Sequence, residues 1–374
     1  MLHLDLPSIP ELRALASSRG EACVSIYLPT TPLTQHVGAA RTAYGNLVRS
    51  ALTQLEDGGV PKRRIAALAD HLDDLAEADG FWRLQAISLA VLATPDWIRA
   101  FRLPNRLTEQ VHIADRFHLK PLLRALTFPH EAFVLALSEN AVRLVEVPAE
   151  GPAATVNAPE LPKSAADETG RASVNDRSPS GRIHGSEGQK VLLRMYARAV
   201  DRAVRSITNN RQAPIILAAA EPLASIYRQA ATHPRLAPHG IDGNPDRVSD
   251  HDLAAAARPI LDRLNQEGVE SFRALFADRA SEGRATLDPA VAARAATHGM
   301  IDRIMVDMDY VLPGTIDEAS GAIEIADGES ARTYSITDEI ACRALATGAE
   351  VMSVRAEDLP ARAPLAAILR YPMA

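Results

Sequence analysis

The stretch Ser180-Gly181-Arg182-Ile183-His184-Gly185-Ser186-Glu187-Gly188-Gln189-Lys190 joins a long polar segment to a basic helix, and the other segments flank this junction. From Lys190 to Ile207 the sequence has no Gly or Pro, so an uninterrupted helix is predicted there. One face of this helix carries a cation at every fourth residue: Lys190, Arg194, Arg198 and Arg202. Another face has the spacing of a buried apolar stripe: Leu192, Met195, Ala199, Ala203 and Ile207.

A Gly-rich tip on a rigid cationic helix suits insertion into a polyanionic cavity, although an ordinary surface helix has the same pattern.

The chain has 374 residues, 47% of them hydrophobic, which predicts two or three domains. Its formal net charge is -7, so any binding of a polyanion must be local. Cys23 and Cys342 lie in separate apolar runs and indicate no metal site. With no signal peptide or membrane-spanning apolar run in the sequence, we expect a cytoplasmic protein without contact to a membrane.

Apolar runs and helical periods divide the chain into three α/β parts. Residues 1–128 are predicted to form an N-terminal α/β recognition domain, with strands at 22–28, 86–93, 97–103 and 111–117. Residues 129–249 contain a predicted β-hairpin (133–147), a loop over 148–188, the basic helix and a buried strand at 214–220. In residues 250–374 helices alternate with short apolar strands, which is typical of an α/β/α sandwich.

This order of parts resembles the bacterial relatives of the archaeo-eukaryotic class-one peptide-chain release factors and of the Pelota-like ribosome-rescue proteins. In that family a variable N-terminal domain precedes a central domain, whose loop ends in Gly-Gly-Gln and continues into a basic helix. The C-terminal domain is a sandwich related to kink-turn-binding ribosomal proteins. The resemblance covers roughly residues 20–374 as an order of elements. It is carried by the residues at 187–190, 217–223, 296–307, 338–351 and 365–371.

The resemblance implies a ribosome-associated translation factor of the rescue, release or hibernation type. Its partners would be the ribosome, ribosomal RNA and tRNA, with a translational GTPase as a further partner, and it needs no cofactor or metal. Lys190, Arg194, Arg198 and Arg202 would then bind RNA.

The resemblance also implies catalytic roles for Gln189 and Gly188 in peptidyl-tRNA hydrolysis. The chain departs from the family here, because Glu187 occupies the place of the first Gly. If that position needs a positive φ, a side chain costs roughly 1 kcal/mol, and a carboxylate is repelled by RNA phosphates. Enzymatic hydrolysis therefore stays open, as does a third alternative, a stress-related protein-interaction module that does not bind RNA.

Overall fold

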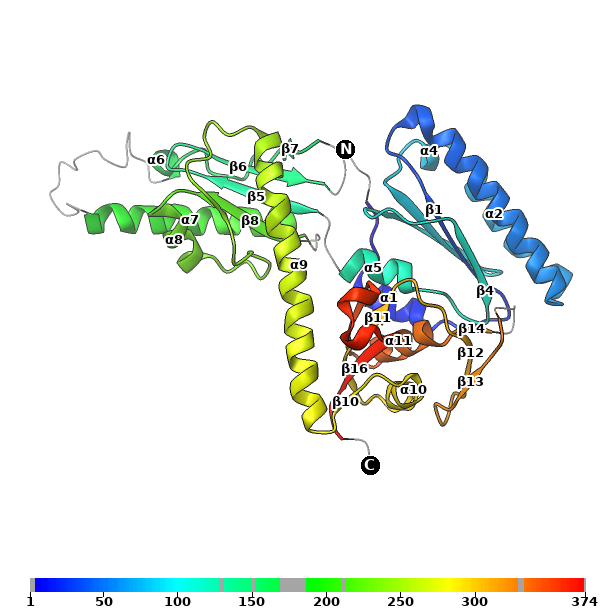
Figure 1. Cartoon of the computed structure of the whole chain (residues 1–374). Helices are drawn as coiled ribbons and strands as arrows, with labels where there is room; N and C mark the ends of the chain where they lie inside the picture. Colours follow the sequence, from blue (N-terminus) through cyan, green and yellow to red (C-terminus); the bar gives the residue numbers. More distant parts are fainter. Residues whose placement is uncertain are drawn as a thin grey trace. The chain divides into compact units, whose positions relative to one another are not determined.

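The computed structural model describes residues 4–127, 131–148, 152–168, 186–209, 213–328 and 333–372. They belong to two compact units (Figure 1): unit 1 comprises Met1–Phe128 with Gly268–Ala374, and unit 2 comprises Pro129–Glu267. Both units combine helices with β-sheet, which confirms the predicted α/β class. No helix within these described ranges is both long and apolar enough to cross a membrane.

The N-terminal part of unit 1 is a sheet of strand order β3-β2-β1-β4 in which neighbouring strands run antiparallel. Alternate residues of β1 point to opposite faces, as the two-residue period of a strand requires. Val24 and Ile26 face the core beneath the helices α2 and α3, whereas Tyr27 faces the C-terminal part. The elements of this part are α1 (Ile9–Ala16), β1 (Cys23–Pro29), α2 (Val37–Asp57), α3 (Lys62–Glu77), β2 (Ser88–Thr94), β3 (Trp97–Leu103) and β4 (Gln110–Ala114).

The C-terminal part of unit 1 is the predicted α/β/α sandwich around a sheet of order β10-β16-β11-β15. Ile304 and Val306 pack under α10 and α11, while Met305, between them in β11, packs with Phe272 of α9 on the other face. The elements are α9 (Asp250–Ser281), β10 (Ala285–Thr286), α10 (Pro289–Thr297), β11 (Ile301–Asp307), α11 (Ile336–Ala346), β15 (Glu350–Val354) and β16 (Leu365–Leu369).

Three features at the junction of these two parts were not predicted from the sequence. The helix α5 (Lys120–Thr127) places Leu122 in one hydrophobic core together with Tyr27 of β1 and Ile340 of α11. A small sheet of order β13-β12-β14 lies in the segment between β11 and α11. Its strands are short: β12 (Pro313–Ile316), β13 (Ile323–Ile325) and β14 (Tyr334–Ser335). The third feature is the core itself, which the N- and C-terminal parts of the chain share within unit 1.

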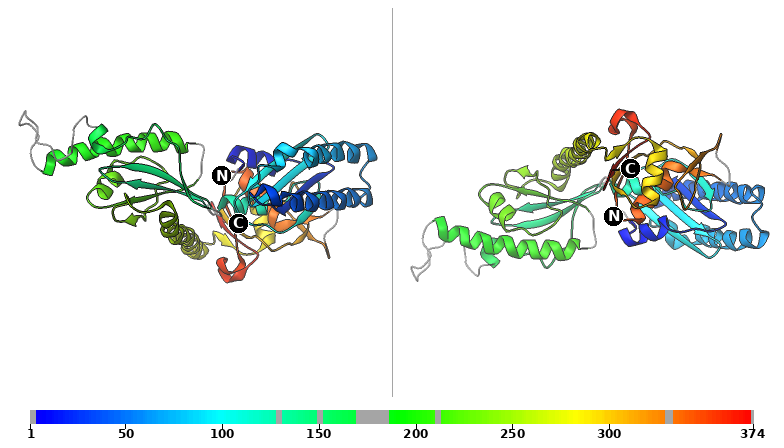
Figure 2. Two further views of the ribbon diagram at one scale, coloured as in Figure 1. Left: turned by 90° about the horizontal axis from the view of Figure 1, so that it is seen from above. Right: turned by 90° about the horizontal axis from the view of Figure 1, so that it is seen from below.

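Unit 2 is built on a sheet of order β7-β6-β5-β8-β9, in which β5 and β6 form the predicted hairpin. Figure 2 shows α7 along one face of this sheet. Leu135 and Leu217 pack on that side with α7 and α8, and Val134 and Ile216 pack against the first half of α9 on the other. The division between the units falls at 267, inside α9, whereas the sequence placed a domain boundary before that helix. The further elements are β5 (Ala132–Leu137), β6 (Val142–Val147), β7 (Ala154–Thr155), α6 (Ala165–Glu168), α7 (Ser186–Thr208), β8 (Ile215–Ala219), α8 (Leu223–Ala230) and β9 (Ile241–Asp242).

Candidate functional site

The basic helix predicted from the sequence is α7, which is anchored to unit 2 along one face. Tyr196 is fully buried, and its hydroxyl donates to the Ser138 carbonyl at 3.0 Å. The Asp201 carboxylate accepts from the backbone N–H and the hydroxyl of Thr232 at 3.0 and 2.7 Å. The apolar residues of this face are Leu193, Tyr196, Ala197, Val200 and Val204. Such anchoring fixes the direction in which the opposite face points.

The arginines of the predicted cationic stripe lie on that opposite, exposed face. Arg194, Arg198 and Arg202 are exposed, and among the described residues none of them makes an ion pair. Lys190 is half-buried and has a partner within the structure. With a rise of about 1.5 Å per residue, the three arginines extend over about 12 Å of one rigid helix. Three guanidinium groups are thus presented to solvent, and no carboxylate of the described residues forms an ion pair with them.

The apolar stripe predicted from the sequence was wrong at Met195. This side chain is 53% exposed, whereas Leu192 and Ala199 are buried and Ile207 is half-buried. Successive residues turn by about 100° around a helix, so Met195 lies between the buried face and the arginine face, on the solvent side. The face that packs against the sheet is instead centred on Val200, with Leu193, Tyr196, Ala197 and Val204 around it.

The helix begins at Ser186, earlier than the predicted start at Lys190. Gly188 and Gln189 therefore lie in the first turns of α7, with Gly188 buried and Gln189 half-buried. Ser and Glu are favoured at helix N-termini, which explains the extension beyond Lys190. The predicted loop over 148–188 contains β7 and α6, and residues 169–185 of it lie outside the described residues, as does the side chain of Glu187.

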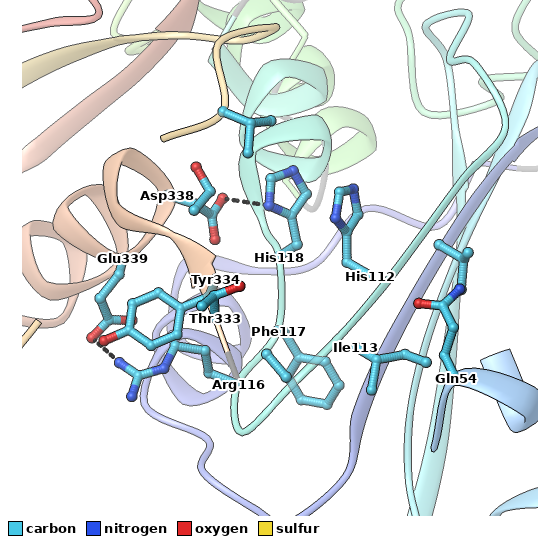
Figure 3. A pocket seen from close by; sticks show the side chains of 14 residues that line it. Gln54, His112, Ile113, Arg116, Phe117, His118, Thr333, Tyr334, Asp338 and Glu339 are labelled. Atoms are coloured by element: carbon cyan, nitrogen blue, oxygen red, sulfur yellow. Dashed lines mark ion pairs between the residues drawn. The ribbon is translucent and has the colours of Figure 1, made fainter. Parts of the chain in front are cut away.

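Unit 1 holds a polar cluster that was not recognised in the sequence. Three arginines converge on one buried carboxylate oxygen, Oε1 of Glu339 (Figure 3 shows the Arg116 contact). The nitrogens are Nη2 of Arg19 at 2.8 Å, Nη1 of Arg116 at 2.6 Å and Nε of Arg343 at 2.7 Å. Glu318, whose side chain is 64% exposed, contacts the same arginines from the solvent side, and Asp115 pairs with Arg116. The cluster joins the N-terminal and C-terminal parts of the unit.

A second buried group lies one residue earlier in α11. The Asp338 carboxylate accepts from the backbone N–H groups of Leu119 and Lys120 at 2.9 and 2.6 Å, so it caps the start of α5. Burial raises the pKa of Asp338 to about 6, although the Lys120 ammonium opposes this shift. The Lys120 side chain is itself fully buried, and its Nζ donates to the carbonyls of Asp307 and Tyr310.

Arg116, Asp338 and Glu339 of these two groups line a cavity of about 90 Å³, which we call the seam cavity. It lies between β4 and the loop after it on one side and β14 with the start of α11 on the other (Figure 3). His118 lies 3.6 Å from Asp338, measured between Nδ1 and Oδ1, and its ring stacks on His112 with the centroids 4.0 Å apart. Burial, and then the neighbouring His112 and Lys120, hold the pKa of His118 well below its ordinary value, so its imidazole is neutral at pH 7.

Comparison with known proteins finds a family match for unit 2. Residues 129–267 match the model of the bacterial archaeo-eukaryotic release factor family 11. No curated protein sequence matches the chain. Unit 2 is therefore similar to that family, in agreement with the resemblance noted in the sequence.

Solved structures of translation termination factors and of Pelota also align with the chain, at low sequence identity. Archaeal Pelota, bound to the ribosome together with ABCE1, is 13% identical at a TM-score of 0.42, with 99% of this chain and 96% of that chain covered. The Saccharomyces cerevisiae translation termination-like factor Dom34 is 13% identical at a TM-score of 0.42, with 76% and 80% covered. The archaeal translation termination factor aRF1 is 14% identical at a TM-score of 0.25, with 98% and 99% covered.

Proposed function

We propose that this protein is a ribosome-associated translation factor of the rescue, release or hibernation type, and that the exposed face of α7 contacts ribosomal RNA or tRNA. The family match of unit 2 supports the class of protein. The observation that carries the contact is the set of exposed arginines, without an ion pair among the described residues, on a helix whose other face is buried. Such guanidinium groups bind phosphates independently of sequence and position the protein on RNA.

Replacing Arg194 and Arg198 together by Gln should weaken ribosome binding and leave folding almost unchanged. Each lost phosphate contact makes the logarithmic salt dependence of binding shallower by roughly 0.7 to 0.9, so two contacts should remove about 1.4 to 1.8 from the slope. Both side chains are exposed and Gln retains helix propensity, so the free energy of unfolding should change by less than about 0.5 kcal/mol. Co-sedimentation with ribosomes over a series of salt concentrations measures affinity and slope, and urea unfolding measures stability.

The matched control is Arg247→Gln, since Arg247 is an exposed arginine of unit 2 outside α7. This variant removes one positive charge outside α7, so it should leave the ribosome affinity and the salt slope almost unchanged. Equal binding by wild type and the double variant would reject the α7 contact. A wild-type protein that stays in the supernatant at low salt would reject the function itself. A translational GTPase partner would be seen as co-sedimentation from lysate that depends on added GTP.

Peptidyl-tRNA hydrolysis by Gln189 is the alternative, and we expect the protein to release no peptide. Glu187 replaces the first Gly of the family tripeptide, and Gln189 lies half-buried in the first turns of α7. Labelled peptide released from stalled ribosomal complexes would be counted for wild type and for Gln189→Ala. The two should match the spontaneous rate, whereas release by wild type that the Ala variant lacks would assign catalysis to Gln189.

A stress-related interaction module without RNA contact is the remaining alternative. It predicts a protein partner that survives ribonuclease treatment in a pulldown with the full chain. The ribosome proposal predicts ribosomal proteins that are lost after the same treatment. The one experiment therefore separates the two functions.

A further inference from the structure

The seam cavity of unit 1 is lined by a largely buried imidazole, whose nearest polar group among the described residues is the Asp338 carboxylate. His118 is 8% exposed, and within the described part of the chain its ring makes no hydrogen bond, since Asp338 Oδ1 lies 3.6 Å from Nδ1. A neutral imidazole has one donor and one acceptor. Because polar groups in protein interiors are normally hydrogen-bonded, this ring can pair with an occupant of the cavity that supplies a polar edge.

The charged groups that line the cavity already have partners. Arg116, which lies 3.9 Å from the ring centroid of Tyr334, is already in contact with Asp115, Glu318 and Glu339. The Asp338 carboxylate, which also lines the cavity, accepts from the backbone N–H of Lys120 and interacts with the ammonium of that residue, which lies outside the lining. A ligand with a full charge would meet no unpaired counter-charge here, and burial would penalise it. The occupant is therefore uncharged.

The size and lining of the cavity fit one ring. Its volume of about 90 Å³ is several times the minimum of about 10 to 15 Å³ that admits one water, so it has room for a single heterocycle. Phe117 and Ile113 give the cavity an apolar side, and the aromatic rings of Tyr334 and His112 border it (Figure 3). At its open side lies the exposed amide of Gln54, whose Oε1 accepts no hydrogen bond from the described residues.

We propose that the seam cavity binds a single nucleobase, with the ring against the aromatic and apolar lining and the polar edge hydrogen-bonded by His118 and Gln54. Aromatic platforms combined with hydrogen bonds to base edges are the usual means by which proteins hold an unpaired base. The base comes either from a free nucleoside or from a single-stranded RNA, because both present the same ring. The site lies in unit 1 and does not depend on the proposed role of α7.

Titration of the full chain with adenosine, guanosine, cytidine and uridine, followed by calorimetry or ligand-observed NMR, tests this proposal. Nucleosides carry no phosphate, so the arginines of α7 do not contribute. At least one nucleoside should bind with a dissociation constant of about 1 mM or lower. Four-nucleotide single-stranded RNAs, added to the Arg194→Gln/Arg198→Gln protein, form the second arm. Binding in that arm alone identifies RNA as the source of the base.

Two variants and one control decide whether the binding is at this cavity. His118→Phe retains an aromatic ring but loses a hydrogen bond, which should weaken binding by about ten-fold. Gln54→Arg fills the open side from an exposed position, so it should abolish binding without unfolding the protein. Thr53→Arg, at the neighbouring exposed residue of α2, should leave binding unchanged. The proposal is overturned if neither probe binds at about 5 mM, or if Gln54→Arg binds as wild type does.

Discussion

Glu339→Ala is expected to destabilise unit 1 by about 3 to 5 kcal/mol, because it removes the buried carboxylate that three arginines share and leaves only the exposed Glu318 in contact with all of them. Arg116 and Arg343 are 7% and 8% exposed, so water cannot replace the lost carboxylate without opening the structure. Glu339 itself is 2% exposed. The loss should be largest where the N- and C-terminal parts of unit 1 meet, since Arg19 and Arg116 come from one part and Arg343 from the other.

Urea unfolding followed by tryptophan fluorescence measures this effect in unit 1 alone, because Trp82 and Trp97 are the only tryptophans of the sequence. The matched control is Glu318→Ala, which removes an exposed carboxylate from the same arginines. It should cost about 1 kcal/mol or less, as exposed ion pairs do. Equal effects of the two substitutions would mean that the cluster behaves as a surface network, and the argument from burial would be wrong.

Lys120→Met is expected to destabilise unit 1 by about 3 kcal/mol, and more at pH 8 than at pH 5. Met fills the space of the lysine stem, but it removes the donor to the carbonyls of Asp307 and Tyr310 and leaves Asp338 without its neighbouring cation. A folded-state pKa raised above the ordinary value contributes stability that is present at low pH and lost as the pH rises through it. The pKa of Asp338 is about 6 in wild type, and the variant should raise it further, so its deficit grows above pH 6.

Tryptophan-detected urea unfolding at pH 5 and pH 8 would measure that difference. The control is Lys62→Met, the same substitution at an exposed lysine of α3, which should change the free energy of unfolding by less than about 0.5 kcal/mol at either pH. A Lys120→Met deficit that is the same at both pH values would show that the ammonium does not stabilise the ionised Asp338.

The local sequence pattern was sufficient to predict the principal helices and strands. The apolar run in β1, the hairpin of β5 and β6, and the Gly- and Pro-free segment of α7 each carry the period of their structure, and each forms where it was expected. It was insufficient for α5, which is short and whose first N–H groups are capped by Asp338 from α11. It was also insufficient for β12, β13 and β14, whose length is too small to establish a period.

By itself, the sequence determined the α/β class, the order of the parts and the cationic face of α7, because these depend on residues within one or two helical turns or one strand. The tertiary structure decided that Met195 is exposed, since the sheet of unit 2 selects the buried face of α7. It also decided that Arg19, Arg116 and Arg343 meet at Glu339 and that His118 lines a cavity. Such contacts join residues far apart along the chain, and only the packing of the N-terminal sheet on the C-terminal sandwich brings these side chains together.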